Sequence, residues 1–407
     1  MKVQGETPVA WRTDYPDDRP DPREEQPWET TDFVSRPEEY MAAVLQQIRP
    51  SFTITDNKLT GTTGAEWWIS EWMDYGNFGR EPRMGLTKER GPNPGDLSPR
   101  NSDGWQVWAV GFYNKSGAAV FGDIFAEPCN PSFPVAVKFP ADTVSVKFLF
   151  TDAPPEEVIY LKDAPEFRAL IDEKGSGSSR QPVEKRQERV IRLLQVDIAV
   201  KDPRARETEW VFGTYVWMGP PKGDRLFDNL VPVSLQWGND PGVYDTTIRQ
   251  SWINATLRGK TYGWEQRRTM GFLGRANGPA DNIRSSCLSC HAAARAPRAS
   301  IGILDSGFDM SIIDASNRIK SHIDTWFQNM KGGGLFRPAE PAASAFDYSL
   351  QLDSAVDRMC RACSEGHLKG PTPSICKATG AFNRPMCKLP TDAVRTFSME
   401  ALVPPRQ

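Results

Sequence analysis

Two cysteines and one histidine stand within five consecutive residues, in the order Cys287, Leu288, Ser289, Cys290 and His291. Cys-x-x-Cys-His is the attachment pattern of c-type haem. Thiols three positions apart lie on one turn of a helix, so both can reach the vinyl groups on one edge of a porphyrin, and the next residue brings its imidazole to the iron. The spacing predicts one covalent haem c held by Cys287 and Cys290, with His291 as an iron ligand.

The residues around the motif suit this chemistry. Small side chains dominate the segment SSCLSCHAAARA, as expected of a short helix that lies against a porphyrin face. Arg284 stands close enough to the motif to pair with a haem propionate, or it is an ordinary solvated arginine. The competing interpretation of the motif is a buried or redox-active Cys-x-x-Cys with an incidental histidine.

The sixth iron ligand would separate electron transfer from catalysis, because a methionine there closes the iron and raises its potential. Met330 is the first candidate for this position, Met310 and His322 are alternatives, and an open or water-bound site is a fourth option. Each side chain also has an ordinary role, since methionines often fill core space and a histidine on an apolar face is often hydrogen-bonded in a core. The sequence leaves this choice open.

Four further cysteines lie near the end of the chain: Cys360, Cys363, Cys376 and Cys387. They form no second haem motif, because Ser364 rather than histidine follows Cys363. They could form two disulfides, or hold a tetrahedral zinc or an iron–sulfur cluster. We favour disulfides, because haem c is attached in an oxidising compartment, where disulfides persist. Cys129 is expected to be a buried free thiol.

The elements that must position the motif are mostly strands. Apolar and polar residues alternate most clearly over 144–150, 194–200 and 210–217, which predicts strands. Further strand candidates are the segments GWQVWAVGFYN, AAVFGDIF, EEVIYL and LVPVSLQWG. About seven strands favour a sandwich. The polar stretch 173–189 predicts a mobile insertion between two strands.

Helical patterns lie on either side of this β region. Ser35, three residues before Glu38, resembles a capping box that opens a helix ending at Pro50. An apolar stripe predicts a helix over 309–330, ended by three glycines, and a further helix over 350–363.

We therefore expect an α+β protein in which a β-sandwich-like domain is followed by a small all-α haem domain of the cytochrome c type. With 407 residues, the chain is too long for one ordinary domain. The expected divisions are 1–60, an extended arm and one helix; 61–260, the β domain; 261–349, the haem domain; and 350–407, a tail stapled by cysteines.

Composition excludes several classes of function. The net charge of −3 comes from 49 basic and 52 acidic residues, which gives no electrostatic reason to bind nucleic acid. No apolar run approaches the roughly eighteen residues that span a bilayer, and the start lacks an apolar signal region, so the sequence is expected to be cytosolic or mature and processed. All three histidines lie at residue 291 or beyond, which excludes hydrolytic triads from the first 290 residues. The thirteen tryptophans fill a core or line a ligand cleft.

The chain resembles a proteobacterial group of mono-haem cytochrome c family proteins. The likeness runs over about residues 65 to 352 and lies in these segments: GWQVWAVGFYN, KFLFTDAP, LLQVDIAVKDPRA, WVFGTYVW, LVPVSLQWGNDPG, NGPADNIRSSCLSCH and FDYSLQL. The resemblance implies export, covalent haem c on Cys287 and Cys290, and His291 as an iron ligand. It implies no defined substrate.

These features lead to three functional expectations. The first is an exported cytochrome, periplasmic or extracellular after loss of its signal peptide, that passes single electrons between redox partner proteins. The second is a peroxidase or oxygenase whose small-molecule substrate enters between the β and haem domains, since an electron carrier needs only about a hundred residues. The third is a haem-bearing subunit of a larger assembly or homo-oligomer, with residues 1–34 reaching a neighbour.

Overall fold

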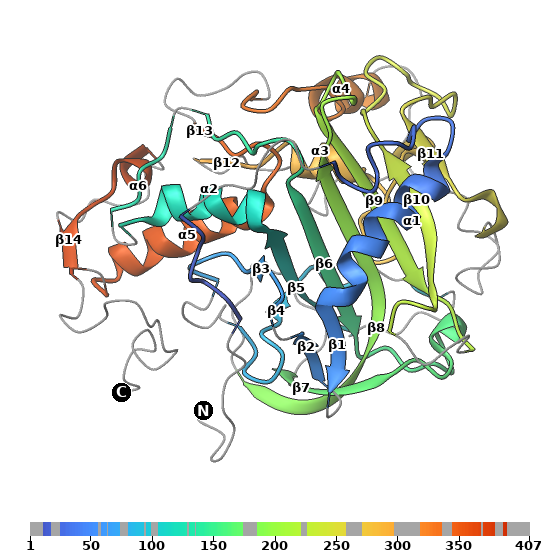
Figure 1. Cartoon of the computed structure of the whole chain (residues 1–407), viewed down its shortest axis with the longest axis horizontal. Helices are drawn as coiled ribbons and strands as arrows, with labels where there is room; N and C mark the ends of the chain where they lie inside the picture. The colour runs from blue at the N-terminus through green and yellow to red at the C-terminus, as the bar shows by residue number, and fades with distance from the viewer. Residues whose placement is uncertain are drawn as a thin grey trace.

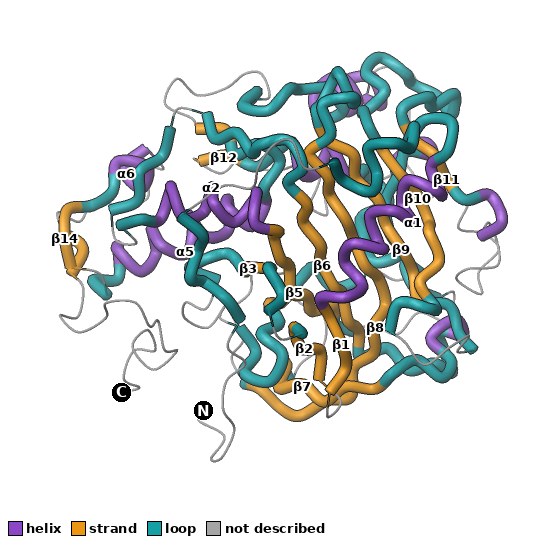
Figure 2. Tube along the Cα trace, viewed as in Figure 1, coloured by secondary structure: helices purple, strands orange, loops and turns teal. Residues whose placement is uncertain are grey.

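A nine-stranded antiparallel sheet is the centre of the fold in the computed structural model (Figures 1 and 2). Seven strands follow the order β11-β10-β9-β8-β6-β5-β3, β4 also pairs with β5, and β7 also pairs with β8. The structure describes residues 11–17, 25–55, 58–62, 64–73, 80–92, 95–98, 105–127, 130–134, 136–173, 185–220, 226–257, 271–296, 318–335, 344–367, 369–378 and 386–388.

The helices and strands have the following bounds. The strands of the large sheet are β3 (Trp67–Trp68), β4 (Thr87–Lys88), β5 (Val107–Asn114), β6 (Val144–Thr151), β7 (Glu166–Asp172), β8 (Arg186–Lys201), β9 (Trp210–Trp217), β10 (Leu230–Gln236) and β11 (Ser251–Ile253). Three two-stranded sheets pair β1 (Phe52–Thr55) with β2 (Lys58–Gly61), β12 (Arg295–Ala296) with β13 (Ser344–Ala345), and β14 (Lys369–Pro371) with β15 (Met386–Lys388). The helices are α1 (Pro37–Ile48), α2 (Lys115–Phe125), α3 (Cys287–His291), α4 (Arg318–Trp326), α5 (Leu350–Ser364) and α6 (Ser374–Ala378).

Alternation along the strands gives the large sheet two different faces. Val146 and Phe148 of β6, and their neighbours Val196 and Ile198 on β8, are buried in one apolar cluster, and we call this side the core face. Helix α1 lies across this side, as Figure 1 shows, and its residues at helical spacing are buried in the same cluster. The burial of both sets of apolar side chains stabilises the packing of α1 on the sheet.

The opposite side, which we call the cavity face, carries a polar row. Lys147 of β6 lies opposite Asp197 of β8, and Asp197 lies opposite Thr214 of β9. Beyond the β3 edge of the sheet lie α2 and α5 (Figures 1 and 2), whose buried side chains form a second cluster with Trp210 and Phe212 of this face. The chain around α3 borders one cavity together with this polar row.

Several expected elements are confirmed, and others were wrong. The strands at 144–150, 194–200 and 210–217 are present, as is the helix at 350–363. The helix that we expected from the Ser35 capping box begins at Pro37 without a side-chain cap, because the Ser35 hydroxyl donates to Asp32 instead (2.5 Å).

Two segments expected to be strands have other structures. AAVFGDIF belongs to helix α2, because the Asn114 side chain accepts a hydrogen bond from the Gly117 N–H (3.2 Å) and caps that helix. EEVIYL is a turn that ends in a short 3-10 helix, Ile159–Leu161. Strand β7 was not expected, and it pairs with a β8 that already begins at Arg186, so only 174–184 of the expected insertion lies outside the described residues.

The domain picture also changes. The structure has one large sheet instead of two facing sheets, and a small all-α haem domain is not seen among the described residues. The described part of the N-terminal arm is not free, because Trp28 and Phe33 are buried in the core cluster. The described part of the 309–330 helix is α4, which ends at Trp326.

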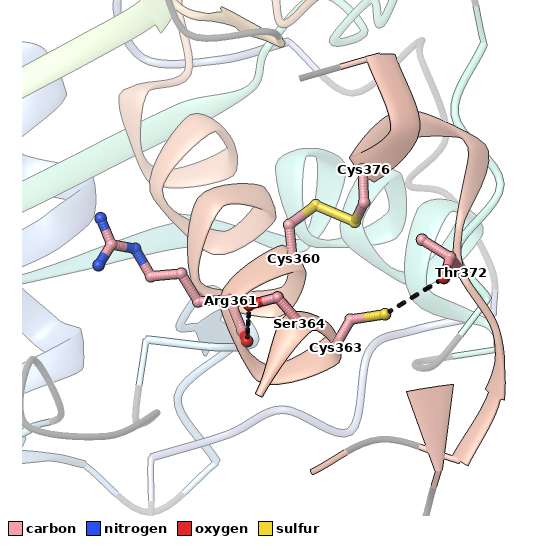
Figure 3. The surroundings of a disulfide bond; sticks show 6 residues. All are labelled: Cys360, Arg361, Cys363, Ser364, Thr372 and Cys376. Carbon is pink, nitrogen blue, oxygen red and sulfur yellow. Dashed lines mark hydrogen bonds between the residues drawn. A yellow bond between two sulfur atoms is a disulfide. The ribbon is translucent and has the colours of Figure 1, made fainter. Parts of the chain in front are cut away.

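The C-terminal cysteines form a disulfide rather than a metal site. Cys360 of α5 is bonded to Cys376 of α6, with an S–S distance of 1.98 Å (Figure 3). Cys363 is also disulfide-bonded, and its sulfur lies 3.9 Å from the Thr372 hydroxyl. The disulfide excludes the tetrahedral zinc or iron–sulfur site that needs all four thiolates. Cys387 lies in β15, whose side chains are outside the described residues, as is Cys129.

Removing the described disulfide should lower stability measurably. Cys360 and Cys376 are 16 positions apart, and closing a loop of about this length restricts the unfolded chain by about 3 kcal/mol. We expect the double variant Cys360→Ala/Cys376→Ala to lose about 2–4 kcal/mol of unfolding free energy in urea denaturation. Ser364→Ala on the same helix is the control, and an equal loss there would contradict the prediction.

Among the described helices, none combines the length and the apolar character that crossing a bilayer requires.

Candidate functional site

The Cys-x-x-Cys-His motif forms the short helix α3 on the cavity face. Ser286 caps it: its hydroxyl accepts from the Ser289 N–H (3.1 Å), and the Ser289 hydroxyl accepts from the Ser286 N–H (2.8 Å). The helix packs against β9. Leu288 N–H donates to Gln236 Oε1 (2.9 Å), which ties the motif to β10. The backbone of the motif is therefore fixed by the sheet.

Both motif cysteines are free thiols, and both line a cavity together with His291. The cavity offers about 160 Å³ to water-sized groups, and about 860 Å³ of empty space when the open solvent at its mouth is included. Its opposite wall is the polar row of the sheet, Lys147, Asp197 and Thr214.

The two thiols are not activated. Burial raises the pKa of Cys287 well above its usual value, and burial likewise raises the pKa of Cys290 to about 11. A redox-active Cys-x-x-Cys lowers a thiol pKa to hold a thiolate. The raised pKa values therefore disfavour a redox-active dithiol.

His291 is oriented by a backbone carbonyl. Its Nδ1 lies 2.9 Å from the carbonyl oxygen of Tyr348. A carbonyl only accepts, so Nδ1 carries the proton and Nε2 keeps its lone pair. Burial lowers the pKa of His291 to about 4, so the ring is neutral at pH 7. The Phe212 ring packs beside it, with ring centroids 4.7 Å apart.

A loop before the motif completes the cavity with a carboxylate pair. Gln195 Nε2 donates both to Asp197 Oδ1 (2.7 Å) and to Asp281 Oδ2 (3.0 Å). The loop approaches so closely that a Cβ on Gly278 would lie 2.2 Å from the Gln195 amide. Burial and, after it, the charge of Asp281 raise the pKa of Asp197 to about 7 against the opposing charge of Lys147.

The raised pKa of Asp197 predicts a pH-dependent stability. The folded-state pKa of about 7 exceeds the unfolded value of about 4, so this group's stabilising contribution is complete below pH 4 and is lost as pH rises through 7. Asp197→Asn removes this loss, and we expect the variant to gain on the order of 1–3 kcal/mol over the parent between pH 5 and pH 8 in urea denaturation. A pH-independent difference, or the same gain for the exposed Asp163→Asn, would contradict the assignment.

The cations at this site differ from those expected. Arg284 is half-buried and is not among the described residues that line the cavity. Arg90 lines it instead, donating to Asp96 Oδ2 (2.6 Å) and to the Ala280 carbonyl (3.0 Å). Lys147 lines it too, 3.1 Å from Glu89. No sequence signal marks these residues, because they depend on strand register and on a loop far along the chain.

None of the three candidate sixth ligands is among the described residues that line the cavity. Met330 is buried in the cluster behind the motif, where its carbonyl accepts from the Tyr348 hydroxyl (2.6 Å), and it does not line the cavity. Met310 lies outside the described residues, as does the side chain of His322 in α4. Among the described lining residues there is no methionine and no second histidine.

The donor set fits one covalent haem: two free thiols and one neutral imidazole with a free Nε2 border a single cavity. Within the described part of the chain, no cluster of three or more histidine, cysteine or acidic side chains could hold a bare metal ion. Comparison with protein-family models, with curated proteins and with solved structures found no match.

Proposed function

We propose that the chain is an exported c-type cytochrome that carries one haem and transfers single electrons between periplasmic partner proteins. The proposal is carried by one observation: Cys287, Cys290 and His291 border the same cavity, with both thiols free and the Nδ1 of His291 bound to the Tyr348 carbonyl. In such sites the second nitrogen of a ligating histidine is held by a carbonyl or carboxylate, which fixes the ring and raises its basicity.

Each residue would have a defined task. Cys287 and Cys290 would hold the haem through thioethers, and His291 would bind its iron through Nε2. When bound, the haem supplies a one-electron redox centre. Arg90 and Lys147, which line the cavity, would pair with the haem propionates in place of Arg284.

Export is supported by the disulfide. Cys360–Cys376 is a bond of the kind that persists in oxidising compartments, where haem c is also attached.

The test is to express the chain in a host with a haem c maturation system and record a pyridine haemochrome spectrum after acid–acetone extraction. We expect a red protein whose haem stays with the polypeptide. A colourless product, or haem that extracts completely, would refute the proposal. A Cys287–Cys290 disulfide in peptide mapping would refute it as well.

A haem-dependent oxidoreductase, a peroxidase or oxygenase, is the second candidate. It is favoured by the absence of methionine or a second histidine among the described cavity-lining residues, and by the polar wall of Asp197 and Lys147. An open iron would bind carbon monoxide tightly in the ferrous protein and react with peroxide. A six-coordinate spectrum that carbon monoxide does not change would exclude this second candidate, and electron transfer would remain the proposed function.

A further inference from the structure

We propose that Asp347 is a positioning residue for the axial imidazole: its buried carboxylate locks the turn that presents the Tyr348 carbonyl to His291. This inference rests on the proposed haem function, and it assigns to Asp347 a control over how strongly His291 donates to iron. Nothing in the Cys-x-x-Cys-His motif indicates this residue, which lies 56 positions away from His291 in the sequence.

The Asp347 carboxylate is fully enclosed, with a side-chain exposure of 0%. Lys201 Nζ lies 3.0 Å from Oδ1 and 2.9 Å from Oδ2. Trp210 Nε1 donates to Oδ1 (2.8 Å), and the Phe139 N–H donates to Oδ2 (2.8 Å). Both oxygens therefore bind neutral donors from two parts of the chain in addition to a lysine from a third. A buried ion satisfied in this way holds its position tightly.

The turn that this carboxylate holds is strained. Asp347 and Tyr348 have φ angles of 43° and 68°, so two successive residues other than glycine are left-handed. Each such residue costs roughly 1–2 kcal/mol, and such conformations persist only where the surroundings determine them. The network around Asp347 supplies that constraint on one residue. The Tyr348 hydroxyl, bound to the Met330 carbonyl, supplies it on the next.

The same turn is anchored at both ends. Before it, the Phe346 N–H donates to the Ala294 carbonyl (3.0 Å), three residues after the motif histidine. After it, the Ser349 hydroxyl accepts from the Leu352 N–H (3.1 Å) and so caps α5. Between these anchors the Tyr348 carbonyl oxygen lies 2.9 Å from His291 Nδ1.

A second observation shows how closely the ion pair is enclosed. A Cβ on Gly332 would lie 2.6 Å from both Asp347 Oδ1 and Lys201 Nζ. The chain therefore leaves no room for any side chain there, and Gly332→Ala disturbs the ion pair without changing either partner. This gives the inference two independent routes to a test.

The experiment is a redox titration of the holoprotein. Asp347→Asn can accept at only one of the two oxygen positions, so its NH2 group must face Lys201 together with either the Phe139 N–H or Trp210 Nε1, which are all donors. We expect the carbonyl bond to His291 to weaken, the imidazole to become a poorer donor, and the ferric form to lose stabilisation. The ferric-to-ferrous ratio at a fixed poise should fall about tenfold, which is a rise of about 59 mV for one electron. Gly332→Ala should change the potential in the same direction.

The matched control is another buried ion pair, Lys88 with Asp172, at 2.9 Å and with side-chain exposures of 5% and 10%. Neither residue lines the cavity, so Asp172→Asn should leave the potential unchanged. If Asp347→Asn folds poorly, the double variant Lys201→Met/Asp347→Asn removes the buried lysine as well and leaves its other partner, Glu209 at 3.2 Å, with 35% of its side chain exposed. A recovered unfolding transition with a raised potential supports the positioning role.

Parent-like potentials for both the Asp347 and the Gly332 variants, each with covalent haem, would overturn this inference and leave the haem function standing. An equal shift in Asp172→Asn would overturn it too, since a general loss of packing would then explain the change. A parent protein without covalent haem would overturn both proposals together.

Discussion

The double variant Cys287→Ala/Cys290→Ala should carry no covalent haem at all. Each thioether needs its own sulfur, and these two thiols are the free cysteines that border the cavity among the described residues. Each single variant keeps one sulfur and should therefore hold less haem, with the altered haemochrome maximum of a porphyrin that retains one vinyl group. The measurement is the ratio of haemochrome absorbance to protein, together with the intact mass.

The control for this prediction is Cys360→Ala, which removes a cysteine of the disulfide on α5 and leaves the cavity untouched. It should retain parent-like haem content in the soluble fraction. If instead Cys287→Ala/Cys290→Ala keeps haem that resists extraction, another residue binds the porphyrin. The roles assigned to Cys287 and Cys290 would then be wrong.

The motif could be found from sequence because its chemistry is local. Two thiols and an imidazole within five residues are set by a single helical turn, and Ser286 caps that turn from the adjacent position. The strands of the sheet could be found for the same reason, since alternation over eight residues already places Val146 and Phe148 on one side and Lys147 on the other.

The partners of the motif could not be found, because they depend on register and on long-range packing. Asp197 faces Lys147 only through the pairing of β6 with β8. The carbonyl that orients His291 lies 57 residues away and belongs to a strained turn with no sequence signal. Every residue has a backbone carbonyl, so side-chain types in the sequence cannot show which carbonyl will bind the histidine.

The expected all-α haem domain is not seen in the described residues, for a related reason. The helical patterns at 309–330 and 350–363 predict helices that pack on one another around a haem, whereas α3 packs on β9 of the large sheet. The sheet can accept it because β8 and β9 carry polar and small residues there, as at Asp197 and Thr214. The strand prediction for AAVFGDIF was wrong for a different reason. The apolar run is compatible with a strand, but the local cap by the Asn114 side chain favours a helix.

The loop that delivers the motif to this face is held by one arginine, Arg275, which has no exposed surface. Its Nε donates to the Asn239 carbonyl (2.8 Å), and one terminal nitrogen donates to the carbonyls of Asp240 (2.9 Å) and Val243 (3.0 Å). Its guanidinium also lies 4.5 Å from the centre of the Phe327 ring. Burial lowers the pKa of Arg275 to about 10, so it remains charged at pH 7.

Replacing this arginine should therefore be among the most damaging single changes in the chain. Arg275→Met preserves most of the apolar length but leaves buried carbonyls without donors, and each such group costs about 1–3 kcal/mol. We expect a loss of about 3–5 kcal/mol of unfolding free energy in urea denaturation. Haem content should fall with it, because Asn239 also accepts from the Ser286 hydroxyl that caps α3 (2.9 Å).

Arg206→Met is the matched control, because Arg206 is exposed and its loss should change the unfolding free energy by no more than about 0.5 kcal/mol. Arg275→Lys separates charge from geometry: one ammonium cannot reach the carbonyls of Asn239, Asp240 and Val243 together, so it should recover only part of the loss. A loss below about 1 kcal/mol for Arg275→Met would mean that water replaces the guanidinium and that the loop is held by its other contacts.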